Sequence, residues 1–207
     1  MLKIRKEQYE ELGKISLKKF EDSMVEHIKE FFPENYDALG EPVVRNVIKY
    51  GVDRAEAHGF ETEPDVNMYI DLMFLLGSHF DTDPQLPWAA AILEDETIAD
   101  SAIRVEKLYD QADEYLDRVE GPDDEHLTNA LDEFSDISFE ELLLTRSEDI
   151  QNITMSLLRR IWPEKCQVVG HAALRNLIRY GEESTQRHRI TSQRGVVLYT
   201  VLMFMLG

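Results

Sequence analysis

The sequence has few of the features that mark secreted, membrane or zinc-binding proteins. Its 207 residues include one cysteine, Cys166, which rules out an intramolecular disulfide and a zinc site built on several thiolates. The most apolar run, residues 196–206, is 11 residues long, whereas a helix needs roughly 20 to cross a bilayer. Residues 1–20 read as a charged amphipathic helix rather than a secretion leader. We therefore expect a cytoplasmic protein without a membrane span.

Basic residues are also scarce. The chain has 22 Lys and Arg against 41 Asp and Glu, a net charge of −19. Most of the excess, −15, falls within residues 94–141, whereas residues 142–207 carry +4. A negative field of this size repels phosphate backbones and attracts basic protein surfaces. We predict no nucleic-acid binding and a protein partner with a basic surface; the alternative is an acidic surface that only keeps the chain soluble.

What the sequence does contain is an internal repeat. Residues 32–77 align without a gap with residues 162–207 at a constant offset of 130, and 16 of the 46 aligned pairs are identical. Identical residues occur in runs, such as Leu-Met-Phe at 72–74 and 202–204. A repeat of this length indicates a duplicated architecture.

Both copies carry the pattern of helices. Apolar residues recur every three or four positions, and no segment shows the strict alternation of a strand. Pro33 and Gly77 mark helix ends, and Thr62 with Asp65 forms a carboxylate variant of the capping box. We predict an all-α fold in which two tandem copies of a three-helix unit pack together through their third helices.

The two copies are separated by an acidic helical insert. The predicted segments are residues 1–93 for copy one with its proline and tryptophan loop, 94–137 for the insert, and 138–207 for copy two. Each copy contains a Tyr-Gly pair in its second helix, and we expect its glycine, Gly51 or Gly181, to let two helices approach closely.

Two polar positions of interest hold the same residue in both copies. One holds Arg45 and Arg175, and the other holds His58 and His188. An arginine at the edge of a core usually pairs with a structural carboxylate. The histidines fall where the second helix of each copy ends, where a side chain can cap free carbonyls. Structural roles are therefore favoured, and substrate contact is the alternative.

The sequence has no complete catalytic or cofactor motif. It lacks a His-Glu-x-x-His segment, a glycine-rich phosphate loop and a Gly-x-Ser-x-Gly elbow. His79, Asp81 and Asp83 match only a fragment of a calcium loop, without its downstream glycine and glutamate. We predict no catalytic residues, no metal site and no cofactor.

Two features suggest a partner-binding surface. Trp88 follows two prolines in the loop after copy one, and we expect it to be largely buried, whereas an exposed Trp88 would suggest an anchor for a partner. A helix predicted over residues 98–119 brings four carboxylates to one face through spacings of three and four. These predicted partner-binding residues are Asp110, Asp113, Glu114 and Asp117.

Residues 50–88 also carry a resemblance. They read Tyr-Gly, six variable residues, His-Gly-Phe-Glu-Thr-Glu-x-Asp-Val-x-x-Tyr-Ile-Asp-Leu-Met-Phe-Leu-Leu-Gly, and then Phe-Asp-Thr-Asp-Pro-x-Leu-Pro-Trp. This phrase resembles a group of duplicated, all-helical bacterial proteins associated with loci for type VI secretion spikes and polymorphic toxins. Residues 190–207 of the second copy are similar to the same group.

The resemblance implies a setting without implying a reaction, because no catalytic motif carries over. It implies a non-enzymatic accessory protein, either a cognate immunity protein or an adaptor or chaperone for a secreted effector. The alternative is an effector or enzyme with a polar site between the two copies, built from the repeated arginines and histidines.

Overall fold

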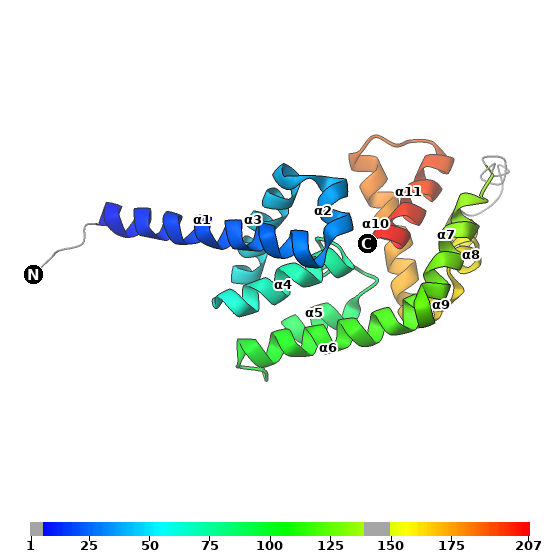
Figure 1. The fold of residues 1–207 in the computed structure, drawn as a ribbon. Coiled ribbons are helices and arrows are strands. Elements are labelled where there is room, and N and C mark those ends of the chain that lie inside the picture. The colour runs from blue at the N-terminus through cyan, green and yellow to red at the C-terminus, as the bar shows by residue number, and fades with distance from the viewer. Residues whose placement is uncertain (1–5, 139–149) are drawn as a thin grey trace, which may run out of the picture. The chain divides into compact units, whose positions relative to one another are not determined.

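The computed structural model describes residues 6–138 and 150–207, with side chains from Leu17 onward. Every regular element in these residues is a helix, which confirms the predicted all-α class (Figure 1). The elements are α1 (Lys6–Phe31), α2 (Pro33–Leu39), α3 (Glu41–Ala57), α4 (Glu63–Leu76), α5 (Pro87–Leu93), α6 (Ser101–Glu120), a short 3-10 turn η1 (Pro122–Asp124), α7 (Glu125–Ser135), α8 (Ile150–Ile161), α9 (Pro163–Val169), α10 (His171–Arg187) and α11 (Gln193–Leu206).

Packing divides the chain into two compact units. Unit 1 comprises Met1–Ser78 and Ile98–Val105, and unit 2 comprises His79–Thr97 and Glu106–Gly207. The loop that follows copy one and most of the predicted insert therefore belong to the same unit as copy two. The division predicted from the sequence follows the repeat rather than the packing, so it stays a prediction.

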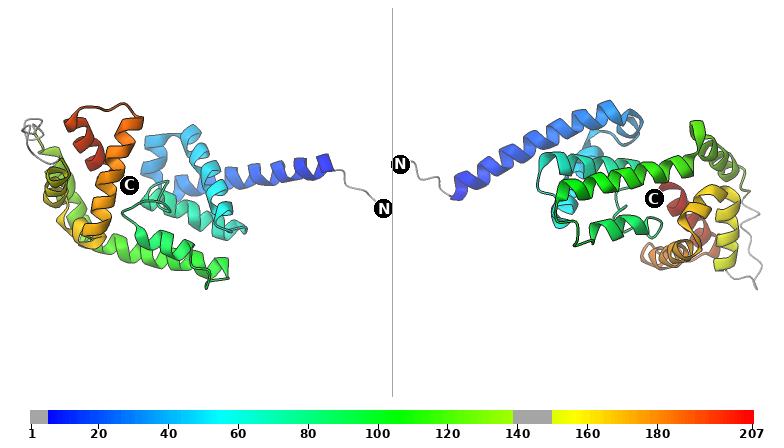
Figure 2. Two further views of the ribbon diagram at one scale, coloured as in Figure 1. Left: turned by 180° about the vertical axis from the view of Figure 1, so that it is seen from behind. Right: turned by 90° about the horizontal axis from the view of Figure 1, so that it is seen from below.

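Unit 1 is built on α1, which packs against α2, α3 and α4. The first half of α1 extends beyond these helices in each view (Figure 2). The first turn of α6 is tied to the unit by polar contacts: Ser101 Oγ donates to Asp65 Oδ2 at 2.8 Å, and Arg104 Nη2 donates to the His58 carbonyl at 2.7 Å. The Arg104 guanidinium also lies 4.9 Å from the centre of the Phe60 ring. These contacts explain why this segment packs with unit 1.

Unit 2 is built in a similar way on α8, which packs against α7, α9, α10 and α11. The indole Nε1 of Trp162, a buried residue, donates to the Val119 carbonyl at 3.0 Å and so joins the end of α6 to the start of α9. Arg160 and Glu133 form an ion pair of 3.7 Å between α8 and α7. The insert therefore forms part of the wall of this unit.

The helix ends follow the repeat. α2, α3 and α4 begin and end 130 residues before α9, α10 and α11. Gly40 and Gly170 separate the first two helices with φ of 74° and 82°, which glycine adopts without strain. The Thr62 hydroxyl accepts from the Asp65 amide, and the Ser192 hydroxyl accepts from the Gly195 amide, so the hydroxyl half of the predicted capping box is present in both copies. Superposition of residues 32–77 on residues 162–207 stays a prediction.

The glycines of the Tyr-Gly pairs lie where two helices cross. A Cβ atom on Gly51 of α3 would come within 2.7 Å of Ile70 Cγ1 and 2.9 Å of Met73 Sδ on α4. A Cβ atom on Gly181 of α10 would overlap Thr200 Oγ1 on α11. The predicted close approach is therefore confirmed at both crossings.

Candidate functional site

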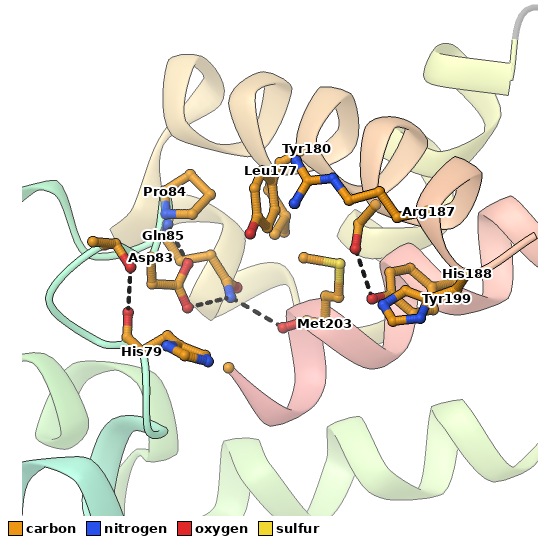
Figure 3. A pocket seen from close by; sticks show the side chains of 13 residues that line it. His79, Asp83, Pro84, Gln85, Leu177, Tyr180, Arg187, His188, Tyr199 and Met203 are labelled. Atoms are coloured by element: carbon orange, nitrogen blue, oxygen red, sulfur yellow. Dashed lines mark hydrogen bonds between the residues drawn. The ribbon is translucent and has the colours of Figure 1, made fainter. Parts of the chain in front are cut away.

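Unit 2 contains a pocket of about 370 Å³ between the loop that follows His79 and the helices α10 and α11 (Figure 3). The loop forms one wall, and α10 contributes Tyr180, Ser184 and Arg187 to the opposite wall. Tyr199 of α11 lines the pocket as well. Pockets of a few hundred Å³ suit small ligands or single side chains of a partner.

The loop is attached to the end of α11 through Gln85. Asp83 accepts two hydrogen bonds from Gln85, one from its backbone amide at 2.7 Å and one from Nε2 at 3.2 Å. The same Nε2 donates to the Met203 carbonyl at 3.1 Å (Figure 3). Burial raises the pKa of the Asp83 carboxyl, and the Gln85 hydrogen bonds and the charges of Lys165 and His79 oppose this rise. The Asp83 carboxylate therefore helps to hold the loop in place through Gln85.

The helical wall of the pocket pairs aromatic rings with polar groups. Ser184 Oγ and the Tyr199 hydroxyl share a hydrogen bond of 2.9 Å. The His188 ring lies 5.9 Å from the Tyr199 ring, and the Arg187 guanidinium lies 6.0 Å from the centre of the Tyr180 ring. Hydroxyl, imidazole and guanidinium groups therefore gather at one side of the pocket, as Figure 3 shows.

A buried lysine, Lys165 of α9, lies against the end of α11 in the core of unit 2. Lys165 Nζ donates to the Phe204 carbonyl and lies 4.8 Å and 5.0 Å from the centres of the Trp162 and Phe204 rings. Burial lowers the pKa of Lys165 to about 8, although the charges of Asp83, Cys166 and Glu120 favour its protonated form. Lys165 is not among the pocket-lining residues, so its role is structural.

The predicted acidic face is present on α6. Asp110, Asp113, Glu114 and Asp117 are all exposed. The opposite side of the helix packs into the protein through buried apolar residues, and these are Val105, Leu108, Ala112, Tyr115 and Val119. The helix is thus a fixed support for the carboxylates, and their contact with a partner stays a prediction.

Trp88 is only partly buried, so the expectation of a largely buried side chain is met in part. Its ring lies 6.1 Å from the Tyr115 ring of α6. Its Nε1 is shielded from solvent and has no hydrogen-bond partner among the described residues. The rest of the side chain retains some exposed surface, and its role as a partner-binding anchor stays a prediction.

The two repeated arginines have different surroundings. Arg45 donates to Glu41 and Asp22, both at 2.8 Å, and these hydrogen bonds raise its pKa. Arg175 is exposed, and the positions that correspond to the two carboxylates hold Asn152 and His171. The structure thus shows a structural ion pair at Arg45 that copy two cannot reproduce.

The two repeated histidines follow the last residues of α3 and α10. The His58 amide donates to the Arg54 carbonyl at 3.2 Å, and the His188 amide donates to the Ser184 carbonyl at 3.2 Å. Each ring lies 5.9 Å from a tyrosine ring of the next helix. Within a unit, the repeated arginine and histidine lie near opposite ends of one helix, about 20 Å apart at 1.5 Å per residue. Neither unit brings them into one site.

The sequence reasoning missed a polar pair in unit 1. His27 Nε2 donates to both carboxylate oxygens of Asp71, at 2.9 Å and 3.1 Å. Burial raises the pKa of the Asp71 carboxyl, and His27 opposes this rise. The repeat offered a signal, because both positions change together in copy two, to Leu157 and Val201.

The described residues contain no group of three or more His, Cys, Asp or Glu side chains that could hold a metal ion. No helix in the described part of the chain is both long and apolar enough to span a bilayer. No family model matches the sequence, and comparisons with curated proteins and with solved structures give no match.

Proposed function

We propose that this chain is a non-enzymatic protein-binding accessory protein of a bacterial toxin or type VI secretion system, acting as a cognate immunity protein or as an effector adaptor. The observation that carries the proposal is the exposed acidic face of α6, formed by Asp110, Asp113, Glu114 and Asp117. Charges held on a packed helix attract a basic partner over long range without needing to be ordered on binding. The secretion setting rests on the sequence resemblance.

The chemistry of the described side chains favours binding over catalysis. Within each unit, the repeated arginine and histidine lie about 20 Å apart along one helix, so they do not form one site there. Burial raises the pKa of Cys166 to about 12, so its thiol is neutral and a poor nucleophile at neutral pH. The buried amine of Lys165 is bonded to a backbone carbonyl.

We also propose that residues 32–77 and residues 162–207 are two copies of one three-helix unit. The constant offset of the helix ends and the matching caps support the duplication. A cytoplasmic location and the absence of nucleic-acid binding belong to the same proposal. Superposition of residues 32–77 on residues 162–207 in an experimental structure would test the duplication, and poor agreement of the helix axes would overturn it.

The binding function can be tested with the products of neighbouring genes. We expect the chain to capture one of them in a pull-down, and the association rate to fall steeply as salt rises, because exposed charges are screened beyond about 8 Å at physiological ionic strength. Neutralising the face with Asp110→Asn, Asp113→Asn, Glu114→Gln and Asp117→Asn should lower the association rate about tenfold and change the dissociation rate less. Stopped-flow or surface plasmon resonance measures both.

A matched control removes four negative charges from unit 1. Its substitutions, at exposed positions, are Glu26→Gln, Glu30→Gln, Asp53→Asn and Glu56→Gln. Both variants should fold like the wild type, because the substitutions are on the surface. Equal loss of association in the two variants would show that only net charge matters. Toxicity of the chain expressed alone would instead favour an effector.

A further inference from the structure

We propose that the pocket of unit 2 binds a carboxylate on a short apolar stem, with Arg187 as its anchor. The carboxylate could belong to a small organic acid or to the C-terminus of a peptide. This inference does not depend on the acidic face of α6, because it concerns a different surface and a ligand of the opposite charge.

The proposed anchor is the guanidinium group of Arg187, which forms no ion pair with the described residues. Arg187 lies in the last turn of α10 and is exposed, with the Tyr180 ring beside it at 6.0 Å. Among the described residues, no carboxylate lies within ion-pairing distance of Arg187. The planar guanidinium fork matches the two oxygens of a carboxylate and can donate to both.

Further donors and an apolar surface lie within the same pocket. The Ser184 and Tyr199 hydroxyls bond to each other, so one of them keeps a proton available for a ligand. The pocket lining also includes Leu177 and the side chain of Met203, which supply an apolar surface for the stem. Its volume of about 370 Å³ lies at the lower end of the range for small-ligand sites.

Asp83 narrows the class of ligand. It lines the pocket, and each of its oxygens accepts one hydrogen bond from Gln85. Its negative charge repels a phosphate dianion more strongly than a singly charged carboxylate, because Coulomb energy scales with the charge product. Of these two kinds of anion, the singly charged carboxylate is therefore favoured.

Copy one has different residues at the positions equivalent to Ser184 and Arg187. The position of Ser184 in copy two corresponds to Arg54 in copy one, whose Nη2 is 3.5 Å from His58 Nε2. The position of Arg187 corresponds to Ala57. Relative to copy one, copy two thus carries a small hydroxyl in place of a long cation and places a guanidinium one turn further along, at the edge of the pocket.

The test is a titration of the whole chain followed by amide and side-chain NMR shifts. The probes are 4-phenylbutyrate, the neutral 4-phenylbutyramide, inorganic phosphate, and acetyl-Gly-Leu with a free or amidated C-terminus. We expect saturable shifts of the Gln85 side-chain amide and the His188 amide with the free carboxylates and much weaker shifts with both amides. Tighter binding of acetyl-Gly-Leu would identify a peptide C-terminus, and tighter binding of 4-phenylbutyrate a small acid.

Two variants and a matched control locate the site. Arg187→Gln should weaken carboxylate binding at least about tenfold, because it removes a charge-assisted hydrogen bond. Tyr199→Phe should weaken binding about threefold, since it keeps the ring and removes only a neutral hydroxyl. Arg179→Gln, an exposed residue two turns earlier on the same helix, makes the same charge change outside the pocket and should bind like the wild type.

The proposal is overturned if acids and amides bind equally, if phosphate binds more tightly than the carboxylates, or if Arg187→Gln and Arg179→Gln have the same effect. Circular dichroism and thermal unfolding of each variant separate a loss of binding from a loss of fold. Failure of this test leaves the proposed acidic docking face intact, because the two surfaces are probed with different variants.

Discussion

Lys165 shows how burial can outweigh the contacts that favour a charged side chain. A backbone carbonyl and two aromatic rings surround its ammonium group, yet its pKa falls from the ordinary 10.5 to about 8. The loss of water around a buried ion costs more than these contacts return. The equivalent residue of copy one, Asn35, is exposed, so the lysine is a feature of copy two alone.

The lowered pKa predicts an unusual pH dependence of stability. Between pH 8 and 10.5 the unfolded chain still holds a proton on Lys165 that the folded chain has released, so this residue destabilises the fold below pH 8 and the effect fades as pH rises. Relative to Lys165→Met, the wild type should gain up to about 3 kcal/mol in free energy of unfolding across this window.

Urea unfolding at a series of pH values measures the difference between wild type and Lys165→Met. Lys19→Met, at an exposed position on α1, is the control for the loss of one lysine charge. A pH-independent difference for Lys165→Met would show that the amine holds its proton normally when the chain is folded.

At the scale of elements, each unit contains an equivalent helix crossing, α3 with α4 in unit 1 and α10 with α11 in unit 2. Different side chains face the glycine at each crossing. Gly51 faces Ile70 and the flexible thioether of Met73. Gly181 faces Thr200, whose hydroxyl is bonded to the Val196 carbonyl at 2.9 Å. The branched, bonded threonine has less freedom to move than a methionine.

This difference predicts the order of two substitutions. Alanine gains up to about 1 kcal/mol over glycine in a helix interior, whereas overpacking costs about 1–3 kcal/mol. Gly181→Ala should therefore destabilise unit 2 by about 1–2 kcal/mol, and Gly51→Ala should cost less, because its new methyl group would meet its nearest neighbour less closely. Denaturant unfolding measures both effects.

Removing the obstacle provides a check on the mechanism. Adding Thr200→Ala to Gly181→Ala removes the hydroxyl that the new methyl group meets and should recover part of the loss relative to Thr200→Ala alone. Additive effects of the two substitutions would show that contact with Thr200 does not cause the cost of a methyl group at position 181.

At the scale of the whole molecule, the repeat keeps the order and ends of the helices while it changes the chemistry at equivalent positions. Unit 1 joins α1 to α4 with His27 and Asp71, and the equivalent residues on α8 and α11 are Leu157 and Val201. A polar pair and an apolar pair of this kind can hold the same helices, provided that neither partner is left alone.

Transferring the apolar pair into unit 1 tests this equivalence. His27→Leu alone leaves Asp71, whose side chain is 13% exposed, without its partner and should cost about 1–3 kcal/mol at pH 7. The cost should shrink near pH 4, because burial already raises the pKa of Asp71 and its protonated form needs no cation.

The double variant His27→Leu with Asp71→Val should return to within about 1 kcal/mol of the wild type, because an apolar pair can replace a partly buried polar pair. A double-mutant cycle by denaturant unfolding at pH 7 measures the coupling. Losses that simply add would show that α1 and α4 do not pack as α8 and α11 do.

The sequence by itself determined the all-helical class and the helix ends marked by capping residues and glycines, because these depend on neighbours within a few residues. Thr62 and Ser192 cap the helices that follow them, and Gly40 and Gly170 separate two helices by their backbone freedom. The acidic face of α6 was predictable for the same reason, since the helical period alone places residues three and four apart on one side.

Only the tertiary structure decided the pocket and the surroundings of its residues. Gln85 bonds to Met203, 118 residues later, and Lys165 reaches Phe204, so no local spacing could have revealed either contact. The packing of the loop against α10 and α11 also placed Arg187 at the edge of the pocket. These properties depend on which surfaces meet after the helices form, because burial and hydrogen bonding between distant segments exist only in the packed chain.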